Sequence, residues 1–180
     1  REILVLGFLL GLHFMLFVSA VMSTTILNAT VLVNTTPIWS MFVSALVFKG
    51  KPSRLAMLGV FASFVGVGII AYSDVVSSRG ALTPSFMGDL EAVLAAVSEA
   101  FYLNYGRKTR SKVPLLSLML IIYLASAVTV LAVGVLIGSP FTLPGNLETV
   151  LPLIGLGILP TAMAHTFYFS SLSNLKSYET

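Results

Sequence analysis

The chain has 180 residues, of which 57% are hydrophobic and only 9% are charged. Soluble domains carry about 25% charged residues because a surface in water needs them, so this composition excludes an ordinary soluble protein and predicts one embedded in a lipid bilayer. The net charge of +3 is explained by basic loops beside a membrane, without a nucleic-acid partner. The chain has no cysteine, which excludes a disulfide, a thiolate metal site and a cysteine nucleophile.

Six apolar segments follow one another along the chain, and a helix of about 20 residues crosses a bilayer. Residues 3–48 hold no formal charge, which fits two crossings with a turn near Ser23 to Thr25. The other four are expected at about 55–72, 86–105, 115–137 and 147–172. Continuous apolar runs of this length favour helices over the alternating strands of a barrel. The sequence therefore predicts an all-α, polytopic transmembrane helix bundle with six spans.

Lys and Arg residues divide unevenly between the two ends of these spans. One end would hold nine of them and the other end only Arg79. Short cytoplasmic loops carry the excess of Lys and Arg, so loops 49–54 and 107–112 are expected in the cytoplasm. We expect a multi-pass protein of the cell membrane and, since the chain begins at Arg1, a piece of a longer protein.

Small residues predict close packing of helices. Gly7 and Gly11 in the first span, and Gly134 and Gly138 in the fifth, have the four-residue spacing that lets two helix backbones approach. Ala62, Gly66 and Gly68 give the third span a narrow face that would also allow another helix to approach closely. We expect these contacts within the chain, or in a homodimer.

Three stretches resemble a known family. NATVLVNTTPIWSMFVSALVFKGKPSRLAMLGVFASFVGVGIIAYSD (residues 28–74) resembles the end of the first EamA repeat of the drug/metabolite transporter superfamily. It shares a proline, Pro37, in a small and polar run, then a short charged loop and a glycine-rich helix. Residues 88–110 and 157–177 are similar to the first and third helices of the second repeat. The chain departs from the family at Glu99, where relatives commonly have Trp.

A weak internal repeat accompanies this resemblance. A shift of 152 residues superposes His13 on His165 and Phe17 on Phe169, and the two spans involved would run in opposite directions, as in inverted-repeat transporters. The resemblance implies ten helices in two inverted repeats. Residues 1–74 would be the C-terminal part of the first repeat, and residues 85–180 the N-terminal part of the second.

The resemblance also implies a function. It favours a secondary transporter that moves small metabolites, such as amino acids or other polar or amphipathic solutes, by alternating access coupled to protons. Exchange of nucleotide sugars or sugar phosphates is the alternative within the superfamily, although no span carries the Lys or Arg that a phosphate needs. A membrane-embedded enzyme and a non-transporting scaffold are the alternatives from other classes.

Motifs for enzymatic chemistry are absent from the sequence. There is no HExxH motif, no glycine-rich phosphate loop and no GxSxG motif. The two histidines and the one acid inside a span are too scattered along the chain to propose a metal site. We therefore expect no enzyme, no cofactor and no metal.

Polar residues inside the spans are candidates for the transport path. Glu99 is the only formal charge well inside a span, where a carboxylate faces a cavity, pairs, or takes up a proton. Glu91, Ser98, Tyr102 and Tyr105 share a stripe of the same helix that is expected to line the path. Glu91 and Asp89 are also near enough to the helix end to reach the headgroups. A neutral Glu99 bonded to another helix is the alternative.

The second and sixth spans each carry a proline and polar faces. Pro37 and Pro160 are expected to interrupt their helices and free backbone carbonyls. Glu99 and His165 are the candidate proton carriers, since His titrates near neutral pH; packing is the alternative for His165, and we expect packing for His13. The expected transport path consists of Asn34, Trp39, Glu99, Tyr102, Thr161, His165 and Tyr168.

Overall fold

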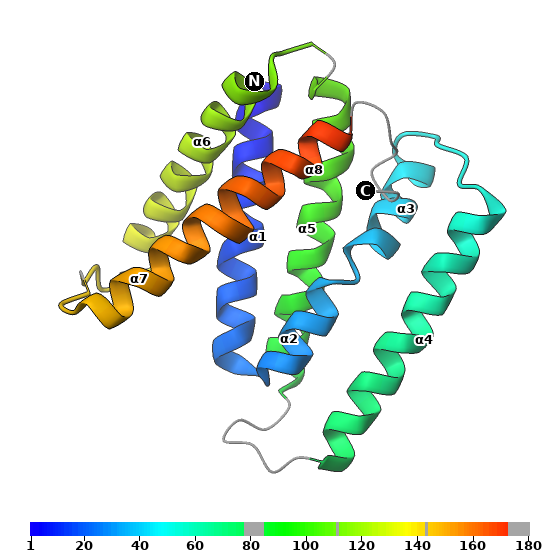
Figure 1. The fold of residues 1–180 in the computed structure, drawn as a ribbon, viewed down its shortest axis with the longest axis horizontal. Coiled ribbons are helices and arrows are strands. Elements are labelled where there is room, and N and C mark those ends of the chain that lie inside the picture. The colour runs from blue at the N-terminus through cyan, green and yellow to red at the C-terminus, as the bar shows by residue number, and fades with distance from the viewer. Residues whose placement is uncertain (78–84, 111, 143, 173–180) are drawn as a thin grey trace.

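A computed structural model describes residues 1–77, 85–110, 112–142 and 144–172. These residues form a bundle of helices with no strand among them (Figure 1), which confirms the predicted all-α class. In chain order the elements are α1 (Glu2–Ser23), α2 (Ile26–Val33), α3 (Thr36–Leu46), α4 (Arg54–Ser77), α5 (Phe86–Arg110), α6 (Leu115–Leu136), α7 (Leu147–Leu156), the π-helix η1 (Gly157–Ala164) and α8 (His165–Ser171).

Four stretches of helix are long and apolar enough to cross a bilayer: Glu2–Ser23, Ile26–Leu46, Leu115–Leu136 and Leu147–Ser171. The stretch Arg54–Ile69 of α4 is a shorter apolar helix. Helix α5 has the length of a span, but Asp89, Glu91, Glu99 and three basic residues in its last turn lower its hydropathy. The structure thus has a helix at each of the six expected positions, and four of these helices are long and apolar enough to cross a bilayer.

Helix α1 is at the centre of the described bundle. It packs along α5 on one side and α6 on the other, while α2 and α3 lie against α5 and α4 lies outside them (Figure 1). The tilted stretch α7–η1–α8 crosses this layer and brings α8 onto α5 and α6. The largest buried cluster joins α1, α5, α6 and α8 and consists of Leu6, Leu10, Tyr102, Leu103, Leu118, Met119, Ile122, Phe169 and Leu172.

The first glycine pair lies at a close contact between α1 and α6, as the spacing predicted. A Cβ on Gly7 would collide with the side chain of Ala125, and one on Gly11 would lie 3.0 Å from the carbonyl oxygen of Ser126. Only glycine therefore lets α1 approach α6 this closely.

The glycines predicted to pack in the third and fifth spans do not join helices in this way. A Cβ on Gly134 would lie 2.8 Å from the ring of Phe141, which is in the segment that follows α6. This glycine therefore makes room for an aromatic ring of that segment and not for another helix. Gly138 has a φ of +69°, a conformation that glycine adopts without strain. Gly66 and Gly68 have nothing within 4 Å among the described residues, so the expected close packing of the third span is not made there.

The described Lys and Arg residues gather at one end of the bundle. The start of α1, the α3–α4 connection and the end of α5 all lie at this end (Figure 1). The residues concerned are Arg1, Lys49, Lys51, Arg54, Arg107, Lys108, Arg110 and Lys112. Arg79 and Lys176, which entered the predicted distribution, lie outside the described residues.

Candidate functional site

The second crossing is broken in its middle. Helix α2 ends at Val33 and α3 begins at Thr36, with Pro37 in the first turn of α3, where its missing N–H costs nothing. Polar side chains add hydrogen bonds to carbonyls at the end of α2 that also accept from the backbone N–H groups of Asn34 and Thr35. The Asn34 amide donates to Thr30 O at 2.7 Å, and the Thr35 hydroxyl donates to Leu32 O at 2.6 Å. The polar residues Asn34 and Thr35 thus make up the interruption between α2 and α3.

A carboxyl group from α5 faces the break. Oε2 of Glu99, near the middle of α5, lies 2.7 Å from the Thr36 hydroxyl oxygen, which in turn lies 2.8 Å from Val33 O. A hydroxyl has a single proton to donate, so Thr36 cannot donate to both oxygens at full strength. The contact joins the broken helix to the only acid well inside α5.

Two imidazole rings lie beside this carboxyl. Nδ1 of His13, on α1, lies 3.9 Å from Glu99 Oε2 and hydrogen-bonds the carbonyl of Ala95 at 3.1 Å. Because a carbonyl only accepts, this bond places a proton on Nδ1 of His13. The ring of His165, on α8, lies 6.3 Å from that of His13, centroid to centroid. The two histidines that the internal repeat superposes are therefore neighbours in the fold.

His165 and Tyr102 are buried members of the cluster that also contains His13 and Glu99. Their ring centroids lie 5.8 Å apart. Neither Nδ1 of His165 nor the hydroxyl of Tyr102 has a hydrogen-bond partner among the described residues. Tyr102 belongs to the apolar cluster and packs against Phe169, with 4.9 Å between the ring centroids. Two unsatisfied polar atoms thus lie in the ring cluster that includes His13, the imidazole beside Glu99.

A small pocket of about 240 Å³ lies at the break. Four crossings contribute to it, namely the first, second, fourth and sixth. Its lining consists of His13, Phe17, Val33, Asn34, Thr36, Pro37, Glu99 and Tyr168. Pockets for drug-sized ligands measure about 300–1,000 Å³, so this one suits a small solute or a few waters. The arrangement offers an acid, an imidazole, a hydroxyl and an amide to one occupant.

Three of the seven predicted path residues line this pocket, and each comes from a different crossing: Asn34, Glu99 and Tyr168. His165 lies behind it, in contact with His13. Trp39 does not line it, because its indole N–H donates to the Thr35 hydroxyl at 3.0 Å, on the other face of the helix. Tyr102 is likewise outside the lining.

Thr161 is also outside this pocket, and its hydroxyl has a local role. Pro160 has no N–H for the carbonyl of Leu156, four residues before it, and the Thr161 hydroxyl donates to that carbonyl at 2.9 Å. The helix widens to a π-helix here, and the Tyr123 hydroxyl of α6 lies 3.1 Å from the carbonyl oxygens of both Thr161 and Ala162. Pro160 therefore interrupts regular α-helix, and the Thr161 hydroxyl satisfies the Leu156 carbonyl that it frees.

Some side chains of the predicted polar stripe of α5, and Asp89 beside it, make contacts with other helices in the structure. The Ser98 hydroxyl donates to Leu9 O of α1 at 2.9 Å. Tyr105 packs on Phe48, with ring centroids 5.0 Å apart. Asp89 accepts from the Thr24 hydroxyl at 2.8 Å, which ties the start of α5 to the α1–α2 turn.

His13 and Thr36 were missed as site residues. The internal repeat pairs His13 with His165 and could have identified it, while Thr36 lies directly before Pro37 in the run that forms the break. In the part of the chain that the structure describes, no group of three or more His, Cys, Asp or Glu side chains is placed to hold a metal ion.

A bundle of apolar helices, one of them broken beside a partly buried acid, is typical of a multi-pass membrane protein. The model of the EamA-like transporter family matches residues 1–72 and 86–180. The chain therefore belongs to this family of the drug/metabolite transporter superfamily, whose members are membrane transporters and not enzymes. The comparisons with curated proteins and with solved structures found no match.

Proposed function

We propose that the chain forms part of a proton-coupled secondary transporter that moves small metabolites, such as amino acids or other polar or amphipathic solutes, by alternating access. The observation that carries the proposal is the broken second crossing, which meets Glu99 at a small polar pocket. Secondary transporters use interrupted helices of this kind at their binding sites. Residues 1–74 and 85–180 would belong to two inverted repeats that rock against each other around this pocket.

The hydrogen bonds around Glu99 support a role in carrying a proton. When Glu99 is protonated, its O–H donates to Thr36 and the Thr36 hydroxyl donates to Val33 O, so both short contacts are made together. When Glu99 is ionised, Thr36 turns its proton to the carboxylate and Val33 O loses its donor. Gain or loss of one proton therefore changes a bond at the helix break, which is a means of coupling protonation to helix movement.

The lining of the pocket weighs against the alternative within the superfamily. A nucleotide sugar or sugar phosphate needs positively charged groups, and among the described residues no Lys or Arg lines this pocket. Its one formal charge is the acid Glu99, which suits the ammonium group of an amino acid or a proton.

Uptake by the full-length protein in proteoliposomes tests the proposed function. Radiolabelled amino acids and a nucleotide sugar are offered separately under an imposed pH gradient. We expect at least one small metabolite to accumulate, and accumulation to stop when an ionophore collapses the gradient. Exchange of the nucleotide sugar alone, with no response to the gradient, would favour the exchanger instead. Protein-free liposomes serve as the control.

The gathering of basic residues at one end supports a cytoplasmic position for loops 49–54 and 107–112. Because the chain has no cysteine, single cysteines can test this. Ser53→Cys at the basic end should resist an impermeant maleimide in intact cells, while Thr142→Cys at the opposite end should react. Both positions are exposed. Rapid labelling of Ser53→Cys, with protection of Thr142→Cys, would reverse the orientation.

A further inference from the structure

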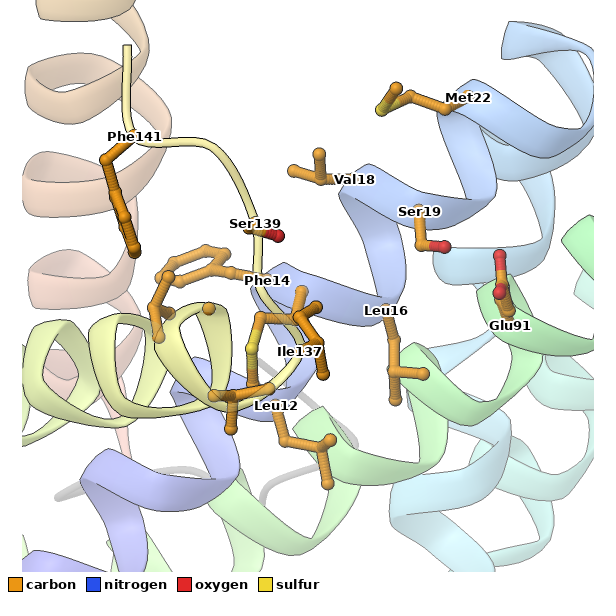
Figure 2. Close-up of a pocket in the computed structure, with 14 residues that line it drawn as sticks. Leu12, Phe14, Leu16, Val18, Ser19, Met22, Glu91, Ile137, Ser139 and Phe141 are labelled. Carbon is orange, nitrogen blue, oxygen red and sulfur yellow. The ribbon is translucent and has the colours of Figure 1, made fainter. Parts of the chain in front are cut away.

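A second and larger cavity lies at the end of the bundle opposite the described basic residues. Its volume is about 590 Å³, and it lies between the second half of α1, the end of α6 with the segment that follows it, and Glu91 of α5. Figure 2 shows Phe14 and Val18 of α1 and Phe141 of the following segment around this space, with Glu91 at its edge near Ser19. None of its lining residues is shared with the small polar pocket.

The walls of this cavity are apolar, and Glu91 is the one charged residue among those that line it. Phe14 and Phe141 offer aromatic surfaces, and Met15 and Met22 supply flexible side chains that adapt to different ligand shapes. The Phe141 ring is seated directly against Gly134, so α6 itself holds this aromatic wall in place. The cavity is therefore a formed apolar surface that ends at a single acid.

The acid has an unused oxygen. Oε2 of Glu91 is buried and has no hydrogen-bond partner among the described residues. Asp89, two residues earlier, is by contrast bonded to Thr24 and Asn28. The described Lys and Arg residues are at the other end of the bundle, so none of them can pair with Glu91. Glu91 is only partly buried, but a buried carboxylate oxygen without a partner is costly, and a cation bound in the cavity would offset that cost.

We propose that this cavity binds an amphipathic cation, whose ammonium group donates to Glu91 and whose apolar body lies against Phe14, Val18 and Phe141. The volume lies within the range of about 300–1,000 Å³ of sites for drug-sized ligands. A neutral amphiphile of the same shape would bury the same apolar surface and leave Glu91 unpaired. The site is separate from the polar pocket, and its occupancy is measured as binding, so it does not depend on the proposed transport activity.

Binding of dansylcadaverine to the full-length protein in lipid nanodiscs tests the proposal. This probe joins a primary ammonium to an apolar fluorophore whose emission rises in apolar surroundings, and dansyl pentylamide is its neutral match. We expect saturable binding of the cationic probe, and a loss of about tenfold or more in affinity on Glu91→Gln, since a hydrogen bond to a charged group is lost. The neutral probe should bind Glu91→Gln and wild type equally.

Glu148→Gln is the matched control, because Glu148 is an exposed acid at the same end of the bundle and does not line the cavity. It should leave the affinity of the cationic probe unchanged. Equal binding of the two probes to wild type, wild-type affinity in Glu91→Gln, or no saturable binding at all would overturn the proposal. The cavity would then be a groove for lipid acyl chains or for another part of the protein.

Discussion

Glu99→Gln is expected to reduce pH-gradient-driven uptake in proteoliposomes to the leak of protein-free vesicles. The amide keeps the size of the side chain and can still donate a hydrogen bond to Thr36. It cannot bind and release a proton, so the exchange of hydrogen bonds at the helix break no longer follows the proton gradient. Facilitated diffusion of solute down its own gradient can survive in this variant, because the pocket is still formed.

Two controls accompany this substitution. Glu148→Gln removes an exposed carboxylate and should transport like wild type. Glu99→Asp keeps a titratable group one methylene shorter and should retain part of the driven uptake. If Glu99→Gln kept wild-type uptake with the same pH dependence, Glu99 would be a structural hydrogen-bonding group and the coupling proposal would be wrong.

Thr36→Val is expected to lower the maximal rate of driven uptake by roughly tenfold, the effect of losing about one hydrogen bond to a charged group. Valine has nearly the shape of threonine but no hydroxyl, so both Glu99 Oε2 and Val33 O lose their contact. Thr36→Ser keeps the hydroxyl and should restore most of the rate. The measurement is initial uptake rate against pH for the three proteins.

A purely structural role of Thr36 would give a different result. It would lower the amount of folded protein and leave the pH profile of the remaining protein unchanged. The proposal requires that the pH of half-maximal uptake changes in Thr36→Val and returns in Thr36→Ser. His13, His165, Tyr102 and Tyr168 also interact electrostatically with Glu99. The pH dependence of the facilitated diffusion that remains in Glu99→Gln therefore separates their contribution from that of the carboxyl.

Much of the fold could be predicted from the sequence, because the membrane imposes length and composition on every crossing. The charge-free stretch of residues 3–48 indicated two spans, and the structure ends α1 at Ser23 and begins α2 at Ile26. Thr25 caps α2 by accepting from the backbone N–H of Asn28. Gly7 and Gly11 were recognised as a packing surface, but the spacing alone could not identify α6 as their partner.

The site was only partly predictable for a similar reason. Glu99 is conspicuous as the one charge inside a span, but its neighbours Thr36 and His13 come from two other crossings. Periodicity assigns a residue to a face of its own helix and does not say which helix that face meets. The Ser98 hydroxyl is an example, since it donates to the carbonyl of Leu9 in a contact with α1 that the sequence did not indicate.

Substrate-driven proton movement tests the central claim most directly. Full-length protein is reconstituted in liposomes that hold a pH-sensitive dye, and a gradient of a transported solute is imposed without any pH gradient. We expect the internal pH to change with wild type, as solute moves, and not to change with Glu99→Gln. Solute movement by wild type with no change in internal pH, or an equal change in Glu99→Gln, would contradict it.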